Sequence, residues 1–258
     1  MRISLIDADS IVYIVSWNHK DSEEMFVLNA VDSIVEKVLS KTKADAYAGF
    51  LSCQKASGYR NSLYKFAPYK GHRGTKPAWV LQWEGTIRAH LKEKWGFREA
   101  ETLEADDWMG CYPKYHAGEF VFCSPDKDIR QLPGLHFNYK QMESEVFTVS
   151  QEEALNNWAM LMLCGDAVDN IKGIPGMGVV KAEKLLKTSL DQFDTICMVS
   201  KAYVTAFGEY YGPEIYNQTS AAVRLDFLFE TCEEEIREIM CGYTPTPVPS
   251  TDLDLPNL

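Results

Sequence analysis

Short apolar runs alternate with longer amphipathic segments along the first half of the chain. The runs at residues 2–6 and 44–51 predict buried strands, and apolar residues recur at helical spacing in the segments 11–17 and 29–39. This order of strand, helix and strand is typical of a mainly parallel sheet covered by helices. The chain is therefore predicted to be an α/β protein with a mainly parallel central sheet flanked by helices.

The pattern continues with one more helix and with strands that complete the sheet. Apolar and aromatic side chains recur every four residues between positions 77 and 95, which predicts an amphipathic helix. Residues 119–124 predict a strand, and residues 135–139 and 145–149 predict a β-hairpin at the edge of the sheet.

From residue 150 the sequence is typical of a mostly helical region. Ser150 and Glu153 have the spacing of a capping box, which predicts a helix start. Later helices are expected at 179–186, 190–199, 202–207 and 216–229. These boundaries divide the chain into a core at 1–149, a helical region at 150–243 and a proline-rich tail at 244–258 that is expected to be disordered.

Acidic residues follow two of the predicted strands. Asp7 comes after the first strand, and Asp126 and Asp128 follow a later one. The carboxyl ends of parallel strands meet at one edge of a sheet, where ligands bind, so these side chains are expected to converge. An acid at a strand end is also a common helix N-cap, a role open to Asp9 or Ser10.

Two further groups of acids lie on predicted helices. On a regular helix Glu104 and Asp107 share a face while Asp106 points away, so spacing alone does not select metal ligands, and acids near a helix start also complement its dipole. Asp166 and Asp169 stand three apart after an apolar helical run. On a helix or its last turn both carboxylates would point to one side, as a hard cation requires.

A basic and aromatic loop offers contacts for phosphate. Lys70, His72, Arg73 and Lys76 fall within one short window beside Tyr69. Cations for a nucleic-acid backbone and a ring for stacking are what such a contact needs. A solvated basic loop would have the same composition, so the two interpretations stay open here.

A glycine-rich turn precedes the predicted helix at 179–186. Gly173, Pro175, Gly176 and Gly178 would form a tight turn that exposes backbone N–H groups at a helix N-terminus, where the dipole favours phosphate. The alternative is a Gly/Pro loop that only joins two core helices.

Composition limits the kind of partner. A net charge of −11 over 258 residues excludes proteins that coat nucleic acid through bulk positive charge, so any DNA binding has to be local. The seven cysteines have no C-x-x-C or close Cys/His spacing, which predicts reduced residues and no zinc site. No signal peptide or transmembrane run is apparent, so the cytoplasm and no membrane partner are expected.

Residues 165–178 resemble the helix–three-turn–helix of the flap endonuclease and 5′-nuclease superfamily, which includes phage 5′-to-3′ exonucleases and the 5′-nuclease domain of bacterial DNA polymerase I. The family pattern is Gly-Asp-x-x-Asp-Asn-Ile followed by Gly-[Ile/Val]-x-Gly-[Ile/Met]-Gly. It is matched at Gly165, Asp166, Asp169, Asn170, Ile171, Gly173, Ile174, Gly176, Met177 and Gly178.

Other motifs of the family occur in the expected order. They are Tyr69-Lys70-Gly71-x-Arg73, the Glu-Ala-Asp-Asp run at 104–107, and Ser124-x-Asp126-x-Asp128. The resemblance implies a PIN-like catalytic core at 1–149 with a helical arch at about 70–98, and a DNA-binding helix–three-turn–helix region within 150–243.

The resemblance also implies roles for individual residues. Lys70 and Arg73 would contact the scissile phosphate and stabilise its developing charge. The implied metal ligands are Asp7, Glu104, Asp106, Asp126, Asp128, Asp166 and Asp169, with Asp107 outside the direct ligands. The implied DNA contacts are Tyr69, Lys70, Arg73, Lys172, Gly173, Gly176, Gly178 and Lys181.

So many carboxylates in one place would repel one another unless divalent cations neutralise them. Oxygen ligands favour Mg²⁺ or Mn²⁺ over zinc, and two such ions would activate a water and stabilise the leaving 3′-oxygen. The resemblance further implies K⁺ at the hairpin carbonyls. The expected function is that of a monomeric 5′-to-3′ exonuclease or flap endonuclease in replication or repair, acting on branched or 5′-ended duplex DNA or on RNA/DNA hybrids.

The sequence departs from the family after the second strand. Many relatives carry an Asp there, whereas residues 49–52 contain none, and Asp9 is a candidate to compensate. A PIN-type or RNase H-like ribonuclease that removes RNA primers shares the acids but does not explain the three-turn motif. A non-catalytic duplex-binding homologue is the other alternative, and the retained acids count against it.

Overall fold

The computed structural model describes residues 1–53, 59–99, 103–141, 144–226, 237 and 240–249. The strands of its central sheet are β1 (Arg2–Asp7), β2 (Ala46–Leu51), β3 (Arg98–Glu99), β4 (Glu119–Cys123), β5 (Gly134–Phe137), β6 (Phe147–Val149) and β9 (Thr246–Pro247).

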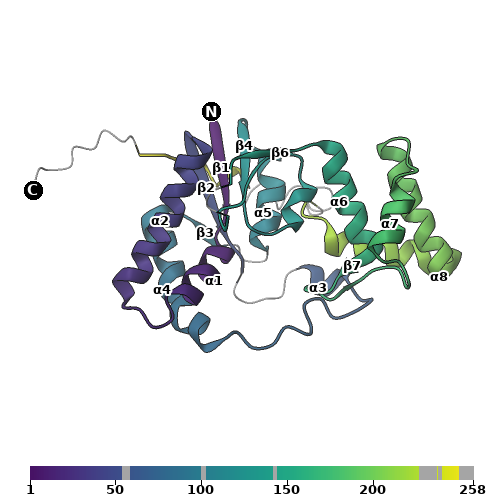
Figure 1. Ribbon diagram of the computed structural model, residues 1–258, viewed down its shortest axis with the longest axis horizontal. Coiled ribbons are helices and arrows are strands. Elements are labelled where there is room, and N and C mark those ends of the chain that lie inside the picture. The colour runs from purple at the N-terminus through teal and green to yellow at the C-terminus, as the bar shows by residue number, and fades with distance from the viewer. Residues whose placement is uncertain (54–58, 100–102, 142–143, 227–236, 238–239, 250–258) are drawn as a thin grey trace, which may run out of the picture.

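Within the described residues these strands form one sheet in the order β3-β2-β1-β4-β5-β6, and β9 pairs with β2 (Figure 1). The pairs β1–β2, β1–β4, β2–β3 and β4–β5 are parallel, whereas β5–β6 and β2–β9 are antiparallel. The mainly parallel sheet predicted from the sequence is confirmed, and so is the hairpin that ends it.

Helices cover the sheet and extend beyond one end of it. They are α1 (Asp9–Asn18), α2 (Glu24–Thr42), α3 (Tyr59–Leu63), α4 (Ala78–Trp95), α5 (Ala105–Cys111), α6 (Gln151–Cys164), α7 (Val179–Leu186) and α8 (Gln192–Val223), with 3₁₀ turns η1 (Tyr112–Lys114) and η2 (Asp128–Gln131). In Figure 1, α1, α2 and α4 lie together on one side, and α6, α7 and α8 group at the opposite end. None of the helices in the described residues is long and apolar enough to cross a bilayer.

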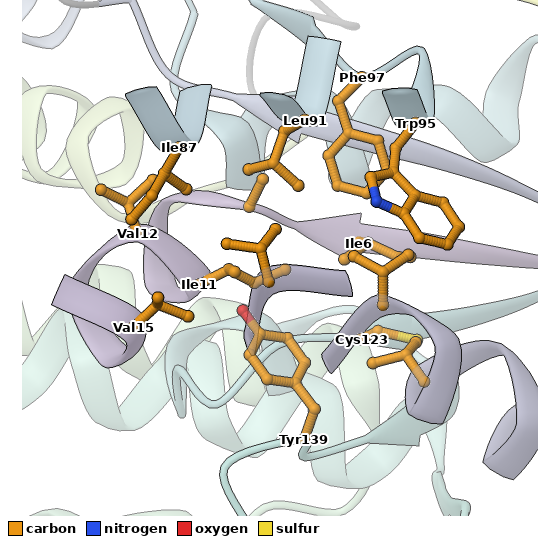
Figure 2. Close-up of a cluster of buried hydrophobic side chains, with 14 of the residues drawn as sticks. Ile6, Ile11, Val12, Val15, Ile87, Leu91, Trp95, Phe97, Cys123 and Tyr139 are labelled. Atoms are coloured by element: carbon orange, nitrogen blue, oxygen red, sulfur yellow. The ribbon is translucent and has the colours of Figure 1, made fainter. Parts of the chain in front are cut away.

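Side chains of β1 pack into two different hydrophobic clusters, because residues of a strand alternate between the two faces of the sheet. Ile6 belongs to the cluster that α1, α2 and α4 cover, and Ile3 and Leu5 belong to the cluster beneath α5. Figure 2 shows Ile87 and Leu91 of α4 in the first of these clusters. β1 is thus the buried centre of the sheet, and the residues at its end are held rigidly.

The helix expected to belong to an arch over the site contributes one face to this core. Trp83, Ile87, Leu91 and Trp95 of α4 are all buried among side chains of α1 and α2. Burial of this apolar stripe fixes one face of α4, and the placement of the segment 70–98 in a helical arch stays a prediction. The segment at 64–77, which forms no helix or strand in the structure, connects α3 to α4.

The acids that follow α6 lie on a hairpin and not on a helix. α6 ends at Cys164, and the short strands β7 (Gly165–Asp166) and β8 (Ile171–Lys172) pair antiparallel. Gly165 has a φ of 74°, and a Cβ there would lie 2.3 Å from the Ile171 carbonyl oxygen, so only glycine allows this turn. The prediction that Asp166 and Asp169 extend from one helical face is therefore wrong.

Two predictions for the C-terminal region need correction. α8 runs from Gln192 to Val223 with one break, at Gly208, so the expected interruption near residue 200 does not occur; the expected end at 229 lies outside the described residues. The tail expected to be disordered from 244 contains β9, which pairs with Ala46 and Tyr47 of β2. Residues 250–258 lie outside the described residues.

Candidate active site

A cavity of about 650 Å³ opens where β1 and β4 end. Among the described residues its lining includes the acids Asp7, Asp9, Glu104, Asp106, Asp126, Asp128 and Asp169. The basic side chains in the same lining are Lys70, Arg73, Lys127 and Lys140. Carboxylates thus outnumber cations, and they do so in a hollow that solvent can enter.

The ends of β1 and β4 meet through a hydrogen bond between their terminal side chains. Ser124, directly after β4, donates its hydroxyl to Asp7 at 2.8 Å, and Tyr139 donates to the Asp7 backbone carbonyl at 2.5 Å. Burial and the charge of Asp9 raise the pKa of Asp7 to about 7. A pKa near neutrality shows that the surrounding groups do not fully compensate the carboxylate charge.

The turn after β4 brings two more carboxylates to the same edge. The backbone N–H of Asp128 donates to Asp126 at 2.9 Å, so the side chains of this turn are kept close together. Burial, Asp126 and Asp166 raise the pKa of Asp128 to about 7. The ammonium of Lys127 lies 3.9 Å from Asp166 and is exposed, so it compensates this charge only weakly.

The start of α5 supplies a third group of acids. Carboxylate oxygens of Glu104, Asp106 and Asp107 all lie within 4.8 Å of one another. Burial, followed by the charges of Asp107 and Glu104, raises the pKa of Asp106 well above its ordinary value. Asp106 thus lies in the cavity as a desolvated carboxylate, which is a suitable ligand for a divalent cation.

Asp107 differs from its neighbours because a buried arginine binds it. Arg60 of α3 donates to both oxygens of Asp107, at 2.7 and 2.8 Å, and to Glu104 at 3.2 Å. Burial raises the pKa of Glu104, but Arg60 and then Lys70 outweigh burial and hold this pKa below its usual value. Sequence reasoning missed Arg60, since no motif or periodicity marks it. Its burial is visible only once α3 lies against α5 and α8.

Two cations of the basic loop, Lys70 and Arg73, form ion pairs with acids of the cavity. Lys70 pairs with Glu104, and Arg73 pairs with Asp169. The hydroxyl of Tyr69 lies 2.8 Å from Glu104 and 3.0 Å from Asp169, and the Lys70 N–H donates to the Asp169 carbonyl at 2.8 Å. This network joins the loop, α5 and the β7–β8 turn at one wall of the cavity.

Asp166 reaches the same region from the helical part of the chain. It is buried, and it lines a small cavity of about 20 Å³ together with Asp106, Asp128 and Asp169. The structure therefore brings acids from both halves of the chain together, although Asp166 does not line the larger cavity as described.

Asp9 lies where β2 ends. Its carboxylate accepts a hydrogen bond from the Ser52 N–H at 3.2 Å and one from Arg88 of α4 at 3.2 Å. Ser52 is also in the lining of the cavity. Sequence reasoning named Asp9 only as a candidate, and it missed Ser52 and Arg88, because neither belongs to a motif.

The predicted hairpin contacts lie apart from the cavity. Among the described lining residues, none of Lys172, Gly173, Gly176, Gly178 and Lys181 is present. Lys181 donates to the Gly176 carbonyl at 2.8 Å, and Gly178 is the N-cap of α7. A Cβ at Gly173 would lie 2.2 Å from the Cys164 backbone, so close packing already explains that glycine.

Comparison with known proteins finds relatives that are similar in sequence. No family model matches the chain. The chain is 30% identical over 172 residues to flap endonuclease Xni of Shewanella loihica, covering 61% of this chain and 64% of that one. It is 32% identical over 149 residues to DNA polymerase I of Bacillus subtilis, covering 51% of this chain and 16% of that one. The chain thus spans less than two thirds of the length of these relatives.

Solved structures share the fold across nearly the whole chain. Bacteriophage T5 5′-exonuclease with bound zinc superposes with a TM-score of 0.69 at 13% identity, covering 94% of this chain and 97% of that one. T5 flap endonuclease in a pseudo-enzyme–product complex with DNA and metal ions gives a TM-score of 0.68 at 13% identity, with the same coverage. At this identity the likeness shows the fold. The chain is thus similar in sequence to a flap endonuclease and to parts of bacterial DNA polymerases I, and similar in fold to T5 5′-exonuclease.

Proposed function

We propose that the protein is a divalent-metal-dependent 5′-nuclease that hydrolyses DNA phosphodiesters as a 5′-to-3′ exonuclease or flap endonuclease. The observation that carries this proposal is the cavity whose described lining combines seven acids with four cations. In a purely structural ion-pair network each carboxylate charge would be compensated by a cation. The pKa values of Asp7 and Asp128 are instead raised to about 7, because their charges are not compensated.

The donor set suits Mg²⁺ or Mn²⁺. The candidate ligands Asp7, Asp106, Asp126 and Asp128 offer only carboxylate oxygens, and the α5 acids lie within 4.8 Å of one another. When bound, two such ions would supply an activated water and stabilise the leaving oxygen. Asp107 is a support for Glu104 in this scheme, since Arg60 engages both of its oxygens.

Lys70 and Arg73 are the groups that would meet the phosphate. Both line the cavity, and their side chains are 25% and 49% exposed, so phosphate oxygens can reach them. Without fixed cations an acidic pocket would repel the scissile phosphate. Charge that develops on the phosphate in the transition state would then be stabilised by these two side chains.

The hairpin and α7 would hold the duplex beside the cavity. Lys172, Lys181, Lys184 and Lys187 are all exposed on this part of the protein, although the net charge of the chain is −11. Backbone N–H groups at the start of α7 suit phosphate and carry no sequence information. A K⁺ ion on the hairpin carbonyls would require Lys181 to leave the Gly176 carbonyl that it now binds.

A side-by-side digestion tests the proposal. End-labelled flap, nicked, blunt and RNA-primed duplexes would be incubated with Mg²⁺ or Mn²⁺, and with EDTA as the control. We expect cleavage from or near 5′ ends of DNA that EDTA abolishes. Cleavage confined to the RNA strand would favour the primer-removing ribonuclease, and binding of duplex without cleavage in either metal would favour the non-catalytic homologue.

A further inference from the structure

Two strands that end at the pocket, β1 and β4, bring acids to it, whereas β2 brings none. β1 ends in Asp7 and β4 leads to Asp126, whereas β2 ends in Leu51 and is followed by Ser52. The side chain that occupies this place comes from another element. The N–H of Ser52 lies 3.2 Å from both carboxylate oxygens of Asp9, which is in the first turn of α1.

Ser52 also connects Asp9 to the acids of α5. Its hydroxyl oxygen accepts the N–H of Ala105 at 2.8 Å, and the residues on either side of Ala105 are Glu104 and Asp106. The same hydroxyl is hydrogen-bonded to Asp9. Serine at the end of β2 therefore holds a carboxylate from α1 beside the start of α5.

Arg88 of α4 also binds the Asp9 carboxylate. Its guanidinium lies 3.2 Å from Asp9, 2.5 Å from the Ser52 carbonyl and 3.1 Å from Glu99. Arg88 is buried, and its neighbour Ile87 on α4 belongs to the core cluster that α1, α2 and α4 cover. The position of α4 on the sheet thus determines the position of one carboxylate in the cavity.

A role for Asp9 in capping α1 does not account for this geometry. The N-cap of α1 is Ala8, and the N–H of Asp9 at that end donates to the Asp7 carboxylate at 3.1 Å. The Asp9 carboxylate is directed to β2 and lines the cavity, and its side chain is 32% exposed. An acid that served only to pair with Arg88 would have no need of this access to the pocket.

We propose that Asp9 is an additional carboxylate ligand of the metal centre, taking the place of a strand-end acid on β2, and that Arg88 is the positioning residue that orients it. This inference rests on the proposed function. It identifies a metal ligand that reaches the centre from a helix, with Ser52 as the link between that helix and the strand.

Metal binding without DNA tests the ligand. Mn²⁺ affinity would be measured by titration calorimetry or by the electron paramagnetic resonance of free Mn²⁺. Asp9→Asn keeps an oxygen for the Ser52 N–H, so it should fold, and we expect it to weaken Mn²⁺ binding by about tenfold or more. Asp21→Asn, an exposed acid outside the cavity lining, is the matched control and should bind as the wild type does.

A double variant that moves the carboxylate from position 9 to position 52 tests the proposal most directly. Ser52→Asp restores a carboxylate to the end of β2, so in combination with Asp9→Asn it should recover most of the lost Mn²⁺ affinity and of the cleavage rate. Recovery of Mn²⁺ affinity in the double variant would support the proposal that Asp9 takes the place of an acid at the end of β2. Wild-type Mn²⁺ affinity in folded Asp9→Asn would overturn the proposal.

Arg88 is tested by affinity and stability together. Arg88→Gln removes the charge and Arg88→Lys retains it, so we expect Mn²⁺ affinity to fall by about 10–100-fold in the first and less in the second. A lower melting temperature with unchanged Mn²⁺ affinity in both would show that Arg88 is only structural. If the wild type itself neither bound Mn²⁺ nor cleaved DNA, the proposed function would fail, whereas an active wild type with a fully active Asp9→Asn would contradict only the role of Asp9.

Discussion

At the scale of single residues, neighbouring acids of one motif have different environments. Asp107 is buried with both oxygens bound to Arg60, whereas Asp106, one position before it, has a pKa raised well above its ordinary value by burial and by nearby acids. A buried ion pair depends on both partners, whereas an uncompensated carboxylate is neutralised by a proton or by a cation from solution. The two aspartates should therefore respond differently to substitution.

Asp128→Asn should abolish cleavage and leave the fold intact. Burial, Asp126 and Asp166 raise the pKa of Asp128 to about 7, so its charge is unfavourable in the metal-free protein. We expect the cleavage rate to fall by about 10²-fold or more, while the melting temperature in EDTA stays the same or rises. Normal turnover in this variant and in Asp126→Asn would contradict the site assignment.

Asp107→Asn should instead destabilise the protein. The variant loses the Asp107 charge but leaves Arg60 its contact with Glu104 at 3.2 Å, so we expect the free energy of unfolding to fall by less than the value of about 3–5 kcal/mol that is typical of a buried ion pair without another partner. Urea denaturation in EDTA measures this. The double variant Arg60→Met with Asp107→Leu should recover much of the loss, since apolar groups of similar volume replace the pair. A stable Asp107→Asn that cleaves poorly would instead indicate a direct metal ligand.

Lys70→Ala should affect the chemical step more than binding. A cation that meets charge developing in the transition state contributes to rate and little to ground-state affinity. We expect the single-turnover rate to fall by about 10²-fold, the scale found on removal of one electrostatic stabiliser, with a much smaller change in duplex affinity. Lys65→Ala is the control, because Lys65 is exposed in the same segment and donates to the Asn61 carbonyl of α3 at 3.0 Å. Weaker binding with an unchanged saturated rate would make Lys70 a docking residue.

At the scale of elements, local signals in the sequence predicted boundaries well. The helix expected at 179–186 is α7, and the capping box of Ser150 and Glu153 starts α6 as expected. Both depend on residues close in sequence, such as an N-cap and an apolar stripe, so no tertiary information was needed.

Elements that depend on distant partners were not predicted. β9 pairs with β2 beside a contact between residues far apart in sequence, in which the Tyr243 hydroxyl accepts the Gly49 N–H at 2.9 Å. Likewise, nothing near Arg60 in sequence indicates that it binds Asp107. The strand-end acids could be found from the strand pattern, but the residues that neutralise or position them could not.

The turn before α7 gives a prediction at this scale. A Cβ at Gly178 would have no described atom within 4 Å, so Gly178→Leu should fold normally and obstruct only an incoming phosphate backbone. We expect weaker binding of all duplexes alike, because contacts to phosphate carry no sequence information. Gly85→Leu on α4, where the surroundings are equally open, is the control. A defect for some sequences only would exclude a backbone contact.

At the scale of the whole molecule, opposite charges are separated in space. The cavity concentrates carboxylates, while exposed lysines of β8 and α7 lie beyond it on the helical part of the chain. In the proposed function, local positive charge would hold a duplex even though the net charge is −11, and the acids would bind the metal ions that act on the phosphodiester. The stability of the molecule should accordingly depend on whether these acids are neutralised.

The pH dependence of unfolding tests this directly. Burial and neighbouring acids raise the pKa of Asp7 and of Asp128 from 3.8 to about 7 in the folded protein. Between these values the folded state binds more protons than the unfolded state, so the free energy of unfolding of the metal-free protein should fall as pH rises from about 4 to about 7. Glu104, whose pKa is lowered from 4.5, acts in the opposite direction only at the acidic end of that range. Because Mg²⁺ binds the ionised carboxylates, its stabilising effect should grow over the same range. Urea denaturation at several pH values, in EDTA and in Mg²⁺, measures both trends, and Asp128→Asn should flatten the slope in EDTA. Stability that rose with pH in EDTA would mean that the acids are already neutralised within the protein and that the cavity has no need of a metal.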